Sequence, residues 1–278
     1  MSAPDAVDIL GVRFHDVTRS EAANAIASLA QAGRQAYVVK PYSEFMPRAA
    51  RDAEIRDLLN GAAFCLPDGV GILWAAHYLS LRGHTLRALW QLPLSLASIA
   101  FSPSSIKRPL RENMAGVDLT WQMLAALERV DATVFLLGGT RAELTGTRER
   151  VEARFPSLRI VGAHPGHFNL AGAENDTLVE QINTATPQAL LVAMGFPLQE
   201  RWITSNLAKL KVNVAIAEGG SFSFISGATR RAPLWMRRAG LEWLFRLLRQ
   251  PWRVRRQVAL PVFVWFVLKE RLNRGHTR

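Results

Sequence analysis

Short apolar runs alternate with longer segments in which apolar residues recur every three or four positions. Bounded apolar runs of four to eight residues are typical of buried strands, and the longer spacing is typical of helices that bury one face. Strands that alternate with helices predict an α/β fold, with a mostly parallel sheet covered by helices on both faces. The runs are residues 35–39, 62–66, 133–137, 158–161, 189–193 and 212–217.

Local signals place several other elements. Two short strands flank Gly11 and predict a hairpin, and Thr18 with Glu21 has the spacing of a capping box at a helix start. Asp52 is expected to cap a helix that ends near Leu59. Further helices are expected at residues 69–79, 117–128, 141–154, 174–183 and 198–207.

Residues 81–115 interrupt this alternation. They contain three prolines, several basic residues and an apolar centre. We interpret them as an insertion with a short amphipathic segment. Two interpretations stay open: a lid packed on the core, or an element that faces a membrane.

Composition restricts the class of protein. A chain of 278 residues that is 49% hydrophobic can bury a large core. Its single cysteine, Cys65, excludes a disulfide framework and a cysteine-rich zinc site. The N-terminus lacks the pattern of a signal peptide, and the longest uncharged apolar runs are too short or too interrupted to span a bilayer. We therefore expect a cytoplasmic protein.

The net charge of +11 is concentrated at one end. Residues 229–278 hold 13 Lys and Arg against 2 Asp and Glu, which leaves 21 bases and 21 acids in residues 1–228. Such asymmetry indicates an anionic partner, either nucleic acid or phospholipid. Tryptophan, phenylalanine and leucine interleave with the arginines here, which favours a membrane surface over nucleic acid. An ordinary solvated helix face is the simpler alternative.

Four glycine-containing turns follow predicted strands, and they begin near Pro67, Gly138, Gly195 and Gly219. Glycine lets a ligand approach the backbone, and the helix that follows offers free N–H groups to a phosphate. Several such turns at one sheet edge predict a nucleotide or sugar-phosphate site. None matches a P-loop or the full dinucleotide-binding motif.

Asp68 is the candidate catalytic base, because it lies at the carboxyl end of a predicted strand, where α/β folds bind ligands. The alternative is an N-cap of the next helix, and the pattern alone favours the cap. Lys40 and Tyr42 follow an earlier strand and could face the same cleft; otherwise the lysine is solvated and the tyrosine packs its ring. His164 and His167 are too few for a metal site without nearby acids.

Together these motifs are similar to those of the WecG/TagA/CpsF family of bacterial glycosyltransferases. The similarity covers about residues 7–256, in the family's order. The segments that carry it are Leu66-Pro67-Asp68-Gly69, Gly116-Val117-Asp118-Leu119, Gly195-Phe196-Pro197-Leu198-Gln199-Glu200-Arg201-Trp202, Gly219-Gly220-Ser221-Phe222-Ser223 and the block from Arg231 to Arg246.

The resemblance implies an inverting, metal-independent transferase without a cofactor. It would move a sugar from a nucleotide donor, usually UDP-linked, to a polyprenyl-diphosphate-linked sugar at the inner face of the cytoplasmic membrane, for cell-envelope polysaccharides. It also implies a Rossmann-like domain at residues 1–228 and a basic helical appendage at residues 229–278, which would contact the membrane. A homo-oligomer is possible, and nucleic acid is not expected.

The resemblance assigns roles to particular residues. The base falls on Asp68 and the glutamine of the family's Pro-x-Gln motif on Gln199. Lys40 and Tyr42 are expected beside Asp68 from their own place after an earlier strand, not from the resemblance. Arg246, Arg253 and Arg256 would meet donor or lipid phosphates. The nucleotide and substrate contacts are expected at Gly138, Gly139, Thr140, Gly166, His167, Gly195, Gln199, Gly220 and Ser223.

This chain departs from the family pattern at three positions. Lys40 and Tyr42 stand where the family commonly has Thr-x-Asn, and Ser223 stands where many members have an aspartate proposed to hold uridine. These departures leave open a second interpretation, in which an inactive relative binds a nucleotide sugar or lipid-linked glycan without turnover.

Overall fold

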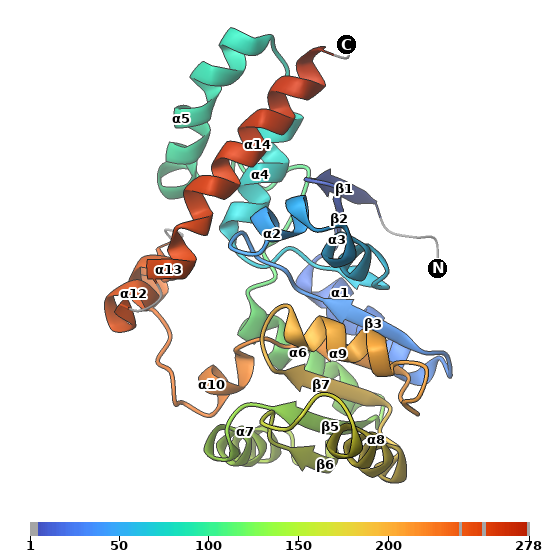
Figure 1. Cartoon of the computed structure of the whole chain (residues 1–278). Coiled ribbons are helices and arrows are strands. Elements are labelled where there is room, and N and C mark those ends of the chain that lie inside the picture. The colour runs from blue at the N-terminus through green and yellow to red at the C-terminus, as the bar shows by residue number, and fades with distance from the viewer. Residues whose placement is uncertain (1–4, 239–240, 252–253, 277–278) are drawn as a thin grey trace.

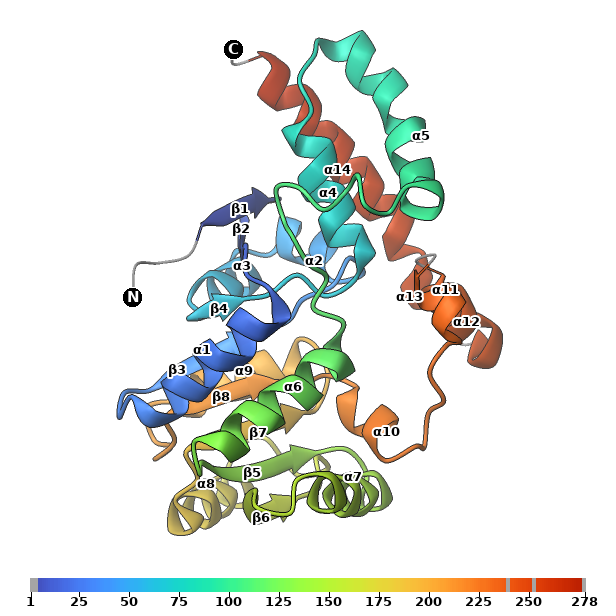
Figure 2. The ribbon, with the colours of Figure 1, turned by 180° about the vertical axis from the view of Figure 1, so that it is seen from behind.

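The computed structural model describes residues 5–238, 241–251 and 254–276. Its centre is a six-stranded sheet in which every neighbouring pair is parallel, in the order β4-β3-β8-β7-β5-β6 (Figures 1 and 2). All six predicted strands are confirmed. They are β3 (Ala36–Val39), β4 (Phe64–Cys65), β5 (Thr133–Gly138), β6 (Arg159–His164), β7 (Ala189–Ala193) and β8 (Val214–Ala217).

Alternate strand residues feed two hydrophobic cores, as the two-residue period of a strand requires. On β5, Phe135 and Leu137 enter one core, while Val134 and Leu136 enter the other. The second core is covered by α1 (Arg19–Gln31), α6 (Gly116–Arg129), α7 (Arg141–Arg154) and α10 (Ser221–Ile225) (Figure 2). The first is covered by α3 (Ala53–Asn60), α8 (Ala173–Ala185) and α9 (Leu198–Asn206) (Figure 1).

The local signals at the N-terminal end are confirmed. β1 (Ala6–Ile9) and β2 (Val12–His15) form the expected antiparallel hairpin. Thr18 and Glu21 form both hydrogen bonds of a capping box on α1, and the Asp52 side chain accepts a hydrogen bond from the Ile55 N–H of α3. The pattern missed α2 (Met46–Arg51), which is only six residues long.

The insertion contains a longer helix than the sequence predicted. α5 (Thr85–Phe101) has 17 residues and packs against α4 (Val70–Ser80) and α14 (Ala259–His276). In both views these three helices lie together beyond one end of the sheet (Figures 1 and 2). Pro93 lies inside α5, and such a residue disfavours a long helix from sequence alone.

The C-terminal region contains α11 (Leu234–Arg238), α12 (Glu242–Arg249), α13 (Val254–Gln257) and α14. Phe263 and Val267 of α14 are buried in the same core as the apolar residues of α4. The Leu10 N–H also donates a 2.9 Å hydrogen bond to Glu270 of α14. The division of the chain at residue 228 stays a prediction, but α14 is packed into the body of the protein.

Within the described ranges, no helix is both long and apolar enough to cross a membrane.

Candidate active site

A cavity of about 930 Å³ lies at the carboxyl ends of the strands. Its walls come from the turns after the strands and from helices α4, α5, α12 and α14. This volume is at the upper end of the range for small-molecule sites. Most of the predicted site residues line it, namely Lys40, Tyr42, Asp68, Gly139, Thr140, Gly166, His167, Gly195, Gln199, Gly220, Ser223, Arg246 and Arg256.

Two predicted residues are not placed in this wall. Gly138 lies behind it, where a Cβ atom would come within 2.3 Å of the Ala193 carbonyl oxygen. Its φ of +128° also favours glycine, so close packing of β5 against β7 explains this residue. Arg253 lies outside the described residues.

Asp68 does not cap the helix that follows it. The N-cap of α4 is Gly69, whose φ is +91°, and its N–H donates a 2.7 Å hydrogen bond to the Asn113 side chain. The Asp68 carboxylate instead accepts a hydrogen bond from the backbone N–H of Gly116, at the start of α6. The N-cap interpretation is therefore wrong, and the carboxylate faces the cavity.

The surroundings of Asp68 suit a proton acceptor. Burial raises the pKa of Asp68 to about 7, although the charges of Lys40 and Arg246 and the Gly116 N–H act in the opposite direction. A carboxylate is an effective general base when its pKa lies near the working pH, because it is then both ionised and basic.

Lys40 is held in a buried ion pair rather than in solvent. Its Nζ lies 2.8 Å from Glu218 Oε1, and both side chains are almost fully buried. The Thr120 hydroxyl donates to the other carboxylate oxygen of Glu218, at 2.5 Å. Glu218 was not among the residues predicted from the sequence, because its only signal there is its place between β8 and a Gly-Gly turn. The positive charge of Lys40 in the cavity wall is therefore balanced by the carboxylate of Glu218.

Gln199 connects two of the glycine turns. Its side-chain oxygen accepts hydrogen bonds from the N–H groups of Gly195, at 3.2 Å, and Gly219, at 2.9 Å. Its amide nitrogen donates to buried Glu200 at 2.9 Å, and burial raises the pKa of Glu200 to about 7. Gln199 thus fixes the shape of the cavity wall that it lines, and its role as a ligand contact stays a prediction.

Ser223 lies beside a carboxylate that the sequence did not place there. Its hydroxyl donates a hydrogen bond to Glu143 of α7, and both residues line the cavity. Glu143 also accepts a 2.9 Å hydrogen bond from the Thr140 N–H, as part of the capping box of α7. Burial acts to raise the pKa of Glu143, but the bonds from Ser223 and Thr140 hold it below its ordinary value. A negative charge is therefore present beside Ser223 in the cavity wall.

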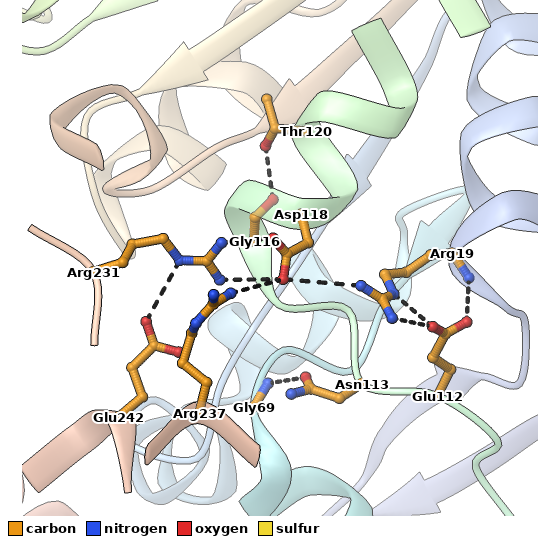
Figure 3. A network of polar contacts seen from close by, with 10 residues as sticks. All are labelled: Arg19, Gly69, Glu112, Asn113, Gly116, Asp118, Thr120, Arg231, Arg237 and Glu242. Carbon is orange, nitrogen blue, oxygen red and sulfur yellow. Dashed lines mark hydrogen bonds and ion pairs between the residues drawn. The ribbon is translucent and has the colours of Figure 1, made fainter. Parts of the chain in front are cut away.

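Asp118 in the first turn of α6 fastens the C-terminal region to the cavity rim (Figure 3). Arg231 binds its carboxylate with two hydrogen bonds of 2.5 and 3.2 Å. Arg237 and Arg19 lie within 3.9 and 3.8 Å of the same group. Burial acts to raise the pKa of Asp118, but Arg231 and the other arginines hold it below its ordinary value. No role had been assigned to Asp118 or Arg237 from the sequence.

Arg246 is available for an anionic ligand. Its guanidinium lies 4.9 Å from the centre of the Phe224 ring and lines the cavity. Over the described ranges, no carboxylate comes within ion-pair distance of it, in contrast to Arg231 and Arg237. Arg256 also lines the cavity and is exposed.

The far end of the cavity is apolar. Trp74 of α4, Leu96 and Ile99 of α5, and Phe263 and Val264 of α14 form it. The cavity therefore joins a polar end at the sheet to an apolar end between helices.

In the part of the chain that the structure describes, no group of three or more His, Cys, Asp or Glu side chains is placed to hold a metal ion. Metal independence stays a prediction.

Comparison with known proteins agrees with the sequence motifs. A family model described as "Glycosyl transferase WecG/TagA/CpsF family" matches residues 7–91 and 92–277. A Bacillus subtilis (strain 168) protein named N-acetylglucosaminyldiphosphoundecaprenol N-acetyl-beta-D-mannosaminyltransferase is 30% identical over 81% of this chain and 76% of its own length. A Staphylococcus aureus (strain MW2) protein of the same name is 27% identical, over 95% of this chain and 92% of its own.

Proposed function

The chain belongs to the WecG/TagA/CpsF family of glycosyltransferases, and on that premise we propose that it transfers an N-acetylmannosaminyl residue from UDP to a polyprenyl-diphosphate-linked N-acetylglucosamine. The cavity carries this proposal, because its polar end at the sheet continues into an apolar end. Such a shape suits one substrate with a charged nucleotide and another with a lipid tail. The names of the relatives support the choice of both sugars.

Asp68 acts as the general base in this proposal. Its carboxylate removes the proton from the acceptor hydroxyl while the oxygen attacks the anomeric carbon of the donor. One base suffices for a single displacement, which inverts the configuration at that carbon. The pKa of about 7 allows Asp68 to be ionised before the reaction and to hold the proton afterwards.

The leaving nucleotide diphosphate gains negative charge as the sugar departs. Arg246 is placed to stabilise it, since its guanidinium lines the cavity without a carboxylate partner among the residues described. Arg256 is a further cationic donor in the same wall. Charge-assisted hydrogen bonds of this kind favour the state in which the charge has developed.

Glu143 is a candidate contact for the nucleotide donor, because its carboxylate lines the cavity. A carboxylate in this wall accepts hydrogen bonds from neutral hydroxyl or N–H groups, such as those of a ribose or a base. We propose that Glu143, positioned by Ser223 and Thr140, supplies an acidic contact to the nucleoside of the donor.

The acceptor lipid requires the protein to work at a membrane surface. Exposed apolar residues of the C-terminal region, including Trp235, Leu248 and Val254, lie among exposed basic residues such as Arg249 and Arg256. This combination suits the anionic inner leaflet of the cytoplasmic membrane. We propose that the region at residues 229–278 makes this contact.

The test is a screen of nucleotide sugars with the full-length protein, followed by product analysis with the lipid-linked acceptor. We expect UDP-N-acetylmannosamine to bind most tightly and to give a β-linked disaccharide. Arg246→Gln should weaken UDP binding about tenfold or more, which is the loss of one charged hydrogen-bond contact. Arg249→Gln on the same helix is the matched control, because Arg249 is exposed and does not line the cavity.

Donor binding without any transfer would contradict turnover and would match an inactive, substrate-binding relative. Equal loss of UDP binding in the two arginine variants would contradict the role of Arg246.

A further inference from the structure

Helix α5 is apolar on both of its faces. Ala88 and Ser95 are buried on its inner face, and Leu96 and Ile99 on the same side line the cavity. The opposite face carries Leu86, Trp90, Pro93, Leu94, Ala97 and Phe101. These positions follow a helical spacing of three, four or seven residues, so they form one continuous stripe.

The side chains of this outer stripe are exposed to solvent. Trp90 is 76% exposed, Leu94 70% and Phe101 88%, and Leu86 is exposed to a similar extent. Single exposed apolar residues are ordinary, but a continuous stripe of large ones marks an interaction surface. The neighbouring helix α14 exposes a tryptophan as well, Trp265.

The charged residues nearest to the stripe in the sequence are all basic. α5 itself contains Arg87 and no acidic residue. Arg82, Lys107 and Arg108 flank it in the insertion, and all four basic side chains are exposed. Over the residues that the structure describes, none of the four forms an ion pair, whereas Arg111 of the same insertion pairs with Asp16 and Glu21. A basic border around an apolar stripe complements the headgroups of anionic phospholipids.

We propose that the outer face of α5 docks on an anionic phospholipid membrane, lying in the interface with its apolar stripe among the acyl chains. Its 17 residues correspond to about 26 Å of helix, which is short of a typical bilayer core and suits a helix that lies in the surface. A tryptophan such as Trp90 is well matched to the depth of the headgroups.

This docking rests on the proposed function and extends it, because it would hold the cavity next to the membrane surface. The inner face of α5 forms part of the apolar end of the cavity through Leu96 and Ile99. When the outer face of the same helix rests in the lipid, the apolar end lies near the source of a lipid-linked acceptor. The docking would thus act in addition to the contact made by residues 229–278.

The experiment uses the full-length protein and vesicles of equal parts phosphatidylglycerol and phosphatidylcholine, without any sugar substrate. Cys65 is buried, so a cysteine introduced by Leu94→Cys is the one that takes an environment-sensitive fluorophore. Thr177→Cys, on the exposed side of α8, is the matched control site. We expect a blue shift and quenching by brominated lipid for the label at position 94 and neither for the label at 177.

A second arm measures vesicle binding by co-sedimentation. Trp90→Glu/Leu94→Glu should lower the partition coefficient about tenfold or more, because charged groups enter the acyl region unfavourably. Thr177→Glu/Gln181→Glu on α8 makes the same change of charge and should bind like the wild type. A melting temperature close to that of the wild type confirms that each double variant is folded.

Two outcomes would overturn the proposal. One is wild-type vesicle binding by the folded α5 double variant, with no lipid response of the label at position 94. The other is a lipid-free dimer that the α5 substitutions convert to a monomer while vesicle binding persists, which would assign the stripe to a second copy of the chain. Because no sugar is present, neither outcome depends on whether the proposed transfer reaction is correct.

Discussion

Asp68 acquires its chemistry from residues that are far from it in the sequence. The local pattern of a strand, a glycine turn and a helix was enough to predict that Asp68 lies at the carboxyl edge of the sheet. The proton affinity of Asp68 was not predictable, because it depends on burial together with Lys40, Gly116 and Arg246. The same limit explains why Glu218 and Glu143 were missed, since their partners come from other elements.

The raised pKa of Asp68 makes a prediction about stability. An unfolded aspartate has a pKa near 3.8, whereas the folded value is about 7. The folded protein therefore holds this proton more tightly, and stability falls as the pH rises from about 4 to 7. Asp68→Asn removes this loss, so it should raise the melting temperature at pH 8 and leave it unchanged at pH 4. Each kcal/mol corresponds to about 2–4 °C in a protein of this size.

Thermal unfolding at the two pH values measures this effect. Asp176→Asn, on the exposed face of α8, is the control and should change little at either pH. A lower melting temperature for Asp68→Asn at pH 8 would show that the carboxylate is stabilised by its surroundings instead.

The Lys40–Glu218 pair should behave as one unit. Lys40→Met leaves a buried carboxylate without its cation, which typically costs about 3–5 kcal/mol. In Lys40→Met/Glu218→Met both charges are gone, so the double variant should be more stable than the sum of the single changes predicts. Urea unfolding of the four proteins gives the coupling free energy. Additive effects would contradict a direct pair.

At the scale of elements, the first five residues of α6 connect the parts of the site. The Gly116 N–H binds Asp68, Asp118 binds the arginines of the C-terminal region, and Thr120 binds Glu218. The sequence predicted this helix but not its connections, which are tertiary. α5 was underestimated for a related reason, since packing against α4 and α14 stabilises a helix that contains Pro93.

A substitution that removes the charge of Asp118 tests this role of α6. Asp118→Asn weakens the attachment of Arg231 and Arg237, so trypsin should cut faster within residues 226–238, and the KM for the donor should rise several-fold. Glu152→Gln removes an exposed ion pair with Arg148 on α7 and serves as the control. Unchanged proteolysis of the Asp118 variant would contradict the attachment.

At the scale of the whole molecule, alternation of strands and helices was enough to predict the parallel sheet and the cover on both faces. Counting the charged residues along the chain was enough to find the basic C-terminal region. Neither could show that α14 returns to pack on α4, a contact between residues almost 200 positions apart. As a result, α14 is part of one of the two hydrophobic cores of the described chain, the one that also contains α4.

Removal of α14 should destabilise the whole protein. A chain that ends at residue 258 loses Phe263, Val267 and Leu268, all buried in the core shared with α4. We expect aggregation, or a melting temperature lower by about 10 °C or more, since several large side chains each contribute about 2–5 kcal/mol. Differential scanning calorimetry measures this. Cooperative unfolding near the wild-type temperature would instead support an independent domain at residues 1–228.

The central claim is that Asp68 is the base for sugar transfer, and the most direct measurement is the turnover of Asp68→Asn at pH 8. The substrates are UDP-N-acetylmannosamine and a lipid-linked N-acetylglucosamine, and UDP affinity is measured on the same samples. We predict that kcat falls about 10²–10⁴-fold, the usual contribution of a general base, while UDP binding stays within about threefold of the wild type. Turnover close to that of the wild type, with the same UDP affinity, would contradict the account.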